Sequence, residues 1–281
     1  MLVFKNIFNA TLGACVLLFL LTVQSSAQDA NDIASLIENA SSERALVLPA
    51  GDYFIEGDIK VRKNIRIDGN GNVRLIAAAP LAKGILNTLP NVNLTVSGIS
   101  FEGATSPDKN GAGIRHDGDT LTILDCRFIR NENGVLATGA DAGIVRIDRS
   151  EFLENGYGDG YSHGIYLSSG GQLRVKRSSF TGTRIGHHVK SLATFTIIDS
   201  TTFYDADGKT SYAVDASRGG ALLITNSMFT KAENASNNAF FNYDLTRGGR
   251  TDRVEIIGNQ INNARRNAVV LRNATPARAV I

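Results

Sequence analysis

Residues 121–152 read LTILDCRFIRNENGVLATGADAGIVRIDRSEF, and this stretch contains the same short phrase twice. The phrase is h-x-h-x-x-x-x-Phe, where h is an apolar residue, and it ends first at Phe128 and then at Phe152. Similar phrases end at Phe101, Phe180, Phe203 and Phe229, and a degenerate one ends at Ile261. The intervals between successive end residues are 27, 24, 28, 23, 26 and 32 residues. A repeat of this period is typical of a solenoid.

Each phrase is followed, after a turn, by a second short apolar segment. Two or three short strands in each period indicate a parallel solenoid, because a single coil buries its apolar face only by stacking on its neighbours. A β-sandwich is the alternative, but it would show hairpin turns about every 8–12 residues and no such period. We therefore predict an all-β solenoid with coils from about residue 45 to 273. The second segments begin at Gly113, Gly134, Gly164, His188, Ala213, Ala239 and Ala268.

The first 27 residues have the pattern of a secretory signal peptide. Lys5 supplies a positive charge, residues 10–23 are almost wholly apolar, and Ser25-Ser26-Ala27 offers small residues for cleavage. A lipoprotein cleavage box at residues 12–15 and an uncleaved membrane anchor are alternatives. The apolar run, however, continues beyond that box and is short for a span of ~20 residues. We expect cleavage near Ala27, no stable membrane anchor, and a periplasmic or secreted product.

Residues 28–281 are predicted to form one domain. Without residues 1–27 the chain has 28 basic and 27 acidic residues, a net charge of +1, and Cys126 as its one cysteine. This balance argues against a nucleic-acid partner, which would favour a strong basic excess. A single cysteine excludes an internal disulfide, and we expect a monomer. Near residues 31–40 an amphipathic helix is predicted, with Ile33, Leu36 and Ile37 on one face.

Two early segments identify a resemblance to known proteins. Residues 47–53, VLPAGDY, and residues 65–71, IRIDGNG, resemble the first coils of right-handed parallel β-helix proteins of the pectate-lyase-like superfamily. The resemblance covers nearly all of residues 28–281. It implies a right-handed parallel β-helix with a helix over its N-terminal end, which residues 28–44 would supply. The superfamily includes lyases, hydrolases, epimerases, esterases and non-enzymatic members, so the resemblance is specific for fold and not for activity.

The second segments predict a column of outward-facing residues. Equivalent residues of parallel stacked strands lie ~4.8 Å apart, so Tyr166, Lys190 and Asp215 are expected on consecutive rungs. Alternation along the strand places His188 on the face of Lys190. The complete predicted column is Arg115, Leu136, Tyr166, Lys190, Asp215, Phe241 and Val270.

A second column beside the first contains His163, His187 and Tyr212, and its exposure stays open because it lies at the edge of the strand. Three of the four histidines therefore gather in one patch with Lys190 and two tyrosines, which are versatile proton-transfer groups. The alternative is a solvated stack of little energetic value, with imidazoles that satisfy turn amides.

Some superfamily members resemble this chain in the same region, through H-x-I-Y, G-H-x-x-K-S and S-Y-x-h-D phrases in successive coils. Here these phrases are residues 163–166, 186–191 and 211–215. The likeness supports the alignment of the coils and specifies no chemistry.

Other polar residues are weaker candidates. Asp159, Asp205 and Asp207 lie in turns and could ligate Ca²⁺, but no complete oxygen cage is visible, and polar turns explain them better. His187 and His188 make a poor zinc pair, because adjacent residues of a strand face opposite ways. We predict no metal site and no cofactor, and we expect His116 to be a lone surface residue.

The residue types in the patch favour a lyase that cleaves an acidic, uronate-containing polysaccharide by β-elimination. This reaction needs a cation beside the carboxylate, a base for the C5 proton and an acid for the leaving oxygen. Lys190 is the candidate neutraliser or base, His163, His187, Tyr166 and Tyr212 are candidate proton-transfer groups, and His188, Asp215 and Arg115 are candidate substrate contacts. A uronate C5-epimerase and a non-catalytic polysaccharide-binding β-helix remain alternatives. A glycoside hydrolase is disfavoured, since it usually needs two carboxylates.

Overall fold

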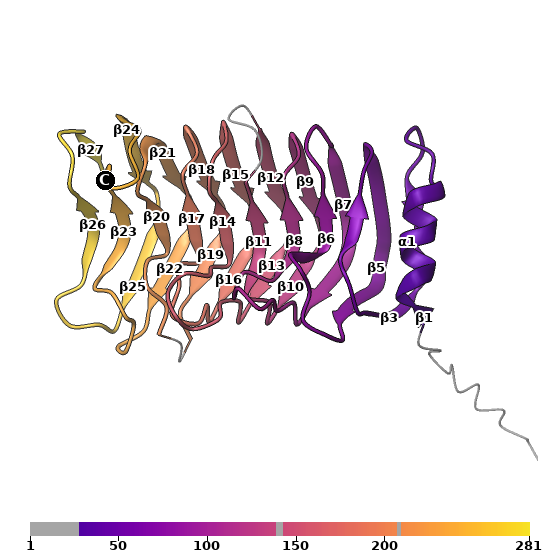
Figure 1. Cartoon of the computed structure of the whole chain (residues 1–281). Coiled ribbons are helices and arrows are strands. Elements are labelled where there is room, and N and C mark those ends of the chain that lie inside the picture. Colours follow the sequence, from indigo (N-terminus) through magenta and orange to yellow (C-terminus); the bar gives the residue numbers. More distant parts are fainter. Residues whose placement is uncertain (1–27, 139–142, 207–208) are drawn as a thin grey trace, which may run out of the picture.

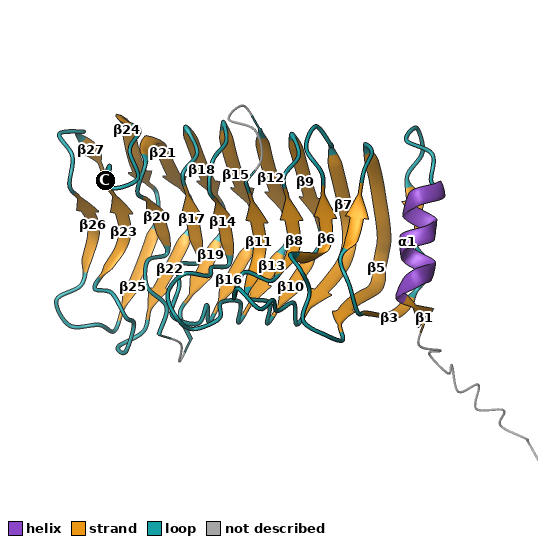
Figure 2. Cartoon of the chain, in the orientation of Figure 1, coloured by secondary structure: helices purple, strands orange, loops and turns teal. Residues whose placement is uncertain are grey.

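The computed structural model describes residues 28–138, 143–206 and 209–281, and the predicted signal peptide lies outside the described residues. The described chain forms a parallel β-helix whose coils stack from the N-terminal helix at one end to the C-terminus at the other (Figure 1). Helix is confined to the N-terminal end and strands make up the coils (Figure 2). The predicted fold class is confirmed.

The strands described form one sheet of 18 strands and one of nine. The larger sheet contains two ladders, which the long strands β5 and β7 join in the first coils. Its strands are β1 Gln28–Asp29, β2 Leu46–Val47, β3 Gly51–Ile55, β5 Ile65–Ala77, β7 Leu94–Glu102, β9 Thr120–Leu124, β10 Arg127–Ile129, β12 Ile144–Asp148, β13 Glu151–Leu153, β15 Gln172–Lys176, β16 Ser179–Thr181, β18 Phe195–Asp199, β19 Thr202–Tyr204, β21 Gly219–Thr225, β22 Met228–Lys231, β24 Arg250–Ile257, β25 Gln260–Asn263 and β27 Ala279–Val280.

The nine-stranded sheet takes one strand from each successive coil and carries the residues of the predicted patch. Its strands are β4 Ile59–Val61, β6 Gly84–Thr88, β8 Ala112–His116, β11 Asn133–Ala137, β14 Ile165–Leu167, β17 Val189–Ser191, β20 Val214–Ala216, β23 Ala239–Tyr243 and β26 Val269–Asn273.

A phenylalanine stack runs through the core along the axis of the solenoid. Neighbouring ring centroids lie 4.6–5.1 Å apart, and the ring planes differ by 6–9°. Ile261 continues the stack in register with Phe229. These are the residues that set the period in the sequence, so each coil contributes one ring to a continuous buried column. The stacked rings are Phe101, Phe128, Phe152, Phe180, Phe203 and Phe229.

The helix α1, Ala30–Asn39, covers the first coil as expected. Ile33 and Ile37 are buried against the core, but Leu36 is 38% exposed, so its predicted place on the buried face is wrong. The Lys63 ammonium donates hydrogen bonds to the carbonyl oxygens of Glu38 and Ala40, both at 2.6 Å. A cation at this position stabilises the helix, because the last carbonyl groups carry partial negative charge.

The coils extend beyond both predicted limits. The strand β1 already pairs with β3, although it lies in the segment expected only to cap the solenoid. At the other end β27 pairs with β24, so the solenoid continues past residue 273. Each of these end strands has two residues and no phenylalanine of the repeat, so the sequence pattern did not include them.

We predict that Phe152→Ala lowers the free energy of unfolding by about 3–5 kcal/mol, because it leaves a cavity between Phe128 and Phe180. Urea unfolding followed by circular dichroism measures this change. Phe195→Ala is the matched control, since Phe195 is 44% exposed and its loss should cost far less. An equal loss of unfolding free energy in the two variants would contradict the conclusion that the phenylalanine stack stabilises the core.

Candidate functional site

The structure confirms the predicted register of the outward column at its centre. Strand pairing places Tyr166 beside Lys190, and Lys190 beside Asp215, on consecutive rungs of β14, β17 and β20. Leu136 and Arg115 continue the same column toward the N-terminal end.

The last two members of the predicted column are wrong. Strand pairing places Asn242 beside Asp215, and Arg272 beside Asn242, where Phe241 and Val270 were expected. Phe241 instead points into the core and meets Phe229 edge-on, with ring centroids 4.8 Å apart. Three consecutive apolar residues occur in each of these strands, so alternation alone could not say which of them faces inward.

Asp215 connects most of the cluster. Its carboxylate lies 3.0 Å from the Lys190 ammonium and accepts hydrogen bonds from the Asn242 amide at 2.7 Å and the Ser217 hydroxyl at 3.1 Å. The Lys190 side chain is 12% exposed and that of Asp215 is 4% exposed. Lys190 is therefore a paired, largely enclosed cation rather than a member of a solvated stack, and its ammonium lies 5.7 Å from the centroid of the Tyr166 ring.

The second column forms a ladder of stacked rings, and its two imidazoles also accept backbone hydrogen bonds. His163 and His187 stack at 4.8 Å, and His187 and Tyr212 stack at 5.1 Å. The His187 backbone N–H donates to His163 Nδ1 at 3.0 Å, and the Tyr212 backbone N–H donates to His187 Nδ1 at 3.2 Å. The Asn133 side chain begins this ladder by accepting the His163 backbone N–H at 2.9 Å. These residues are enclosed at the strand edge.

The ladder determines the protonation of both imidazoles. A ring nitrogen that accepts a backbone N–H carries no proton, so each neutral ring is protonated at Nε2. Burial lowers the pKa of His187 to about 4, despite Asp215, whose carboxylate lies 3.6 Å from Nε2. Burial lowers the pKa of His163 well below its ordinary value, and the neighbouring His187 and Lys190 lower it further. Both rings are neutral at pH 7 and hold their neighbours in position.

Tyr212 ends the ladder, and its phenol oxygen is paired with an arginine. Its phenol oxygen accepts a hydrogen bond from Arg272 Nη1 at 3.2 Å, and this contact raises the pKa of Arg272. Arg272 comes from β26, 60 residues later in the chain. A guanidinium beside a phenol oxygen stabilises negative charge that develops there.

His188 does not share the face of Lys190, contrary to the prediction. It is fully buried, with Nδ1 2.8 Å from the Thr183 hydroxyl and Nε2 3.1 Å from the Asp205 carboxylate. In the preceding coil its place is taken by Gly164, where a Cβ would point at Phe180. The chain turns inward before β17 begins, which breaks the alternation used for the prediction.

Asp205 belongs to a buried polar cluster and not to an open calcium-binding turn. Its carboxylate lies 3.6 Å from the Lys231 ammonium, and both side chains are almost fully buried. Lys231, whose pKa is lowered by burial, also donates to the Ser211 carbonyl at 2.8 Å. Asp159 accepts the Tyr161 backbone N–H at 3.0 Å within its turn. Asp207 lies outside the described residues, within which no group of three metal-ligating side chains occurs.

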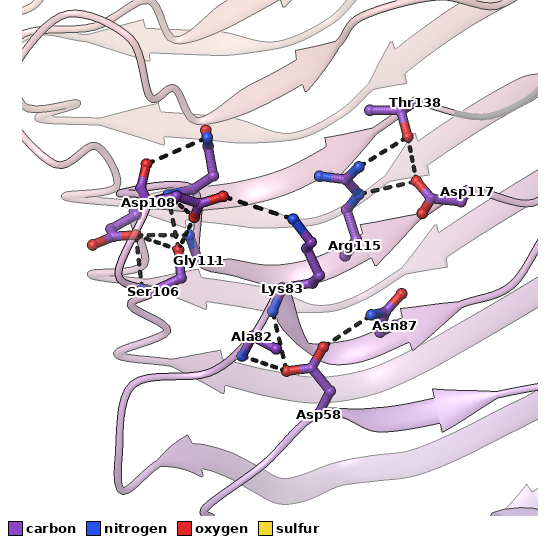
Figure 3. A network of polar contacts seen from close by, with 12 residues as sticks. Asp58, Ala82, Lys83, Asn87, Ser106, Asp108, Gly111, Arg115, Asp117 and Thr138 are labelled. Carbon is purple, nitrogen blue, oxygen red and sulfur yellow. Dashed lines mark hydrogen bonds and ion pairs between the residues drawn. The ribbon is translucent and has the colours of Figure 1, made fainter.

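Arg115 lies in the predicted column but not in the cluster. It is three rungs from Lys190, and its guanidinium pairs with Asp117 at 2.9 Å and donates to the Thr138 hydroxyl at 3.2 Å (Figure 3). The position of His116 was also mispredicted. It is 1% exposed, and its Nδ1 lies 2.8 Å from the Thr88 hydroxyl.

Sequence reasoning missed Asn242, Asp244 and Arg272. The Asn242 amide donates to Asp244 at 2.9 Å as well as to Asp215, and so links the cluster to the following loop. One sequence signal could have found Asn242 and Asp244. They are two residues apart, as Asp215 and Ser217 are in the preceding coil, and residues two apart lie on the same face of a strand.

Among the described helices, none has the length and apolar character needed to cross a membrane. Comparison of the chain with models of protein families and with curated proteins found no match.

We predict that the free energy of unfolding falls between pH 6.5 and pH 4. The pKa of His116 and of His187 is lowered to about 4 by burial, and that of His163 is lower than its ordinary value of 6.5 for the same reason. Below pH 6.5 the unfolded chain therefore binds protons that the folded chain does not bind. The free energy of unfolding has its full value above pH 6.5 and decreases as the pH falls. Each histidine contributes a slope of up to about 1.4 kcal/mol per pH unit.

Urea unfolding at several pH values measures this slope. The variant His116→Asn, which lies away from the Lys190 cluster, should flatten it by the contribution of one proton. An identical slope in the variant and the parent protein would show that His116 is not held neutral by burial.

Proposed function

We propose that the chain is an exported member of the pectate-lyase-like superfamily that cleaves a uronate-containing acidic polysaccharide by β-elimination. The observation that carries the proposal is the pairing of Lys190 with Tyr166 on one outward face, next to an enclosed ladder that ends at Tyr212. The Tyr212 phenol accepts a hydrogen bond from Arg272. The parallel β-helix fold supports it and leaves the activity open.

The residues are assigned roles by their contacts. Lys190, held by Asp215, neutralises the carboxylate of the sugar and so makes the C5 proton more acidic. Tyr212, with its phenolate form stabilised by Arg272, removes the C5 proton. The C4–O bond then breaks as the C4–C5 double bond forms, and the Tyr212 proton passes to the leaving oxygen. His163 and His187 position Tyr212 through the ladder and transfer no proton.

The remaining assignments follow the sequence pattern. Residues 1–27 direct export and are cleaved near Ala27, which places the protein in the periplasm or outside the cell. The partner is an acidic polysaccharide or oligosaccharide, and the protein acts as a monomer without a metal or other cofactor.

A non-catalytic polysaccharide-binding protein is the second candidate. It is favoured by one observation, namely that Lys190 is already paired with Asp215 and that both imidazoles accept backbone hydrogen bonds. A C5-epimerase would use the same proton abstraction, followed by return of a proton from the opposite face.

The test is incubation with alginate, pectate, glucuronan and a glycosaminoglycan, followed by the ultraviolet absorbance of the unsaturated uronate product. A lyase raises the absorbance with one of these polymers. A changed proton spectrum without cleavage would indicate an epimerase, and retention of polymer without either change would indicate a binding protein.

On the polymer that is cleaved, Tyr212→Phe should lower kcat by about 10²- to 10⁴-fold, because it removes the proton-transfer oxygen and keeps the ring on His187. Full activity in this variant would refute the role of Tyr212.

Lys190→Ala should also abolish turnover, whereas Lys190→Arg should retain more activity than Lys190→Ala, because the cation pairs with the carboxylate and gives up no proton. Lys176→Ala is the matched control, since Lys176 lies on β15 in the other sheet and pairs with Asp199. Unchanged urea midpoints show that each variant is folded. Equal activity of Lys190→Ala and the control would refute the site.

A further inference from the structure

A pocket of about 290 Å³ lies where the turns after β17 and β20 meet the loop before β24. This volume is close to the lower end of the range for small-ligand sites, about 300–1,000 Å³. Its lining includes Leu192, Thr194, Arg218, Gly220, Gly249 and Arg250.

Among the described residues, the lining carries two positive charges and no carboxylate. Arg218 and Arg250 come from successive coils, and strand pairing places Arg250 beside Gly219, the residue after Arg218. Among the described residues neither guanidinium makes a side-chain hydrogen bond or ion pair. Other exposed arginines, such as Arg149 with Asp125, are paired with acids in neighbouring coils. Two unpaired guanidiniums at one pocket favour an anion.

Glycines shape the pocket around these side chains. Gly220 and Gly249 have φ angles of 77° and 89°, which other residues rarely adopt. A Cβ at Gly249 would overlap the backbone oxygen of Arg218 and lie 2.6 Å from its Cγ. The absence of that Cβ lets the loop approach the Arg218 side chain closely.

The pocket is connected to the cluster through short, well-packed segments. Leu192 lies two residues after Lys190, and Arg218 lies three residues after Asp215, so each pair is separated by at most about 7–11 Å along the chain. The loop that supplies Gly249 is anchored by a hydrogen bond from the Arg247 backbone N–H to the Ser217 carbonyl at 2.8 Å. Asp244, at the start of this loop, is bound to Asn242.

We infer that Arg218 and Arg250 bind the carboxylate of a second uronate unit, in the same polysaccharide chain whose reacting unit lies at Lys190. The inference rests on the proposed function for the identity of the polymer. Guanidinium groups bind carboxylates through paired hydrogen bonds, and the pocket has room for a single sugar unit. The pocket therefore favours a polysaccharide with a negative charge on a sugar unit other than the one at the cleaved bond.

The test uses galacturonate, glucuronate, galactose and inorganic sulfate as separate ligands of the full protein. Amide chemical shifts of Gly220 and Gly249 report on the pocket directly. We expect a uronate to shift both amides and galactose to leave them unchanged, and we expect no uronate-induced shift in the Arg218→Ala/Arg250→Ala double variant. Arg174→Ala is the control, since Arg174 is an exposed arginine on β15 in the other sheet. It should behave as the parent protein does.

With an oligouronide, the double variant should bind about tenfold to hundredfold more weakly than the parent, the loss expected for hydrogen bonds to a charged group. Equal shifts by galactose, shifts by sulfate alone, or full affinity in the double variant would overturn the inference. Failure of the proposed function gives a different pattern. Uronates would then shift the two amides, while no acidic polymer is bound or cleaved.

Discussion

Parallel pairing between successive coils is the constraint on which the rest of the structure depends. Each strand bonds to the equivalent strand of the next coil, so a residue lies one rung from its counterpart and like side chains stack on like. This stacking of equivalent residues produces the apolar phenylalanine stack in the core and the polar ladder from His163 to Tyr212 at the strand edge. The same constraint brings together Tyr212 and Arg272, which are distant in the chain.

The polar cluster is organised around neutral rings and one buried carboxylate. His163 and His187 have no free Nδ1, because each accepts a backbone N–H of the next coil. Asp215 holds Lys190 in place and reduces its freedom to move toward solvent. The chemistry proposed here is therefore carried by Tyr212 and its guanidinium partner, while the imidazoles fix the position of the phenol. Positive charge also gathers in the last coils, since residues 244–281 contain seven arginines against three acidic residues.

The sequence predicted the centre of the site better than its edges. The phenylalanine period aligned the coils correctly, and that alignment placed Tyr166, Lys190 and Asp215 on consecutive rungs. Arg272 was missed because its strand contains adjacent apolar residues, and the pattern then admits two registers.

The errors at His188 and His116 have related physical causes. His188 precedes its strand at a corner of the coil, where strict alternation no longer holds, and it turns inward to Thr183 and Asp205. His116 follows Arg115 on the opposite face of its strand, so alternation predicts an inward side chain; the surface assignment rested on its polarity alone. The Arg218 pocket had no signal in the repeat, because turns and an inserted loop form it.

The most direct test of the proposed site is a crystal structure of the Tyr212→Phe variant with a bound oligouronide. We expect one sugar carboxylate at the Lys190 ammonium, the C5 hydrogen of that unit facing the ring at position 212, and a second carboxylate between Arg218 and Arg250. An oligouronide bound along the 18-stranded sheet, or along the nine-stranded sheet with no carboxylate near Lys190, would contradict it.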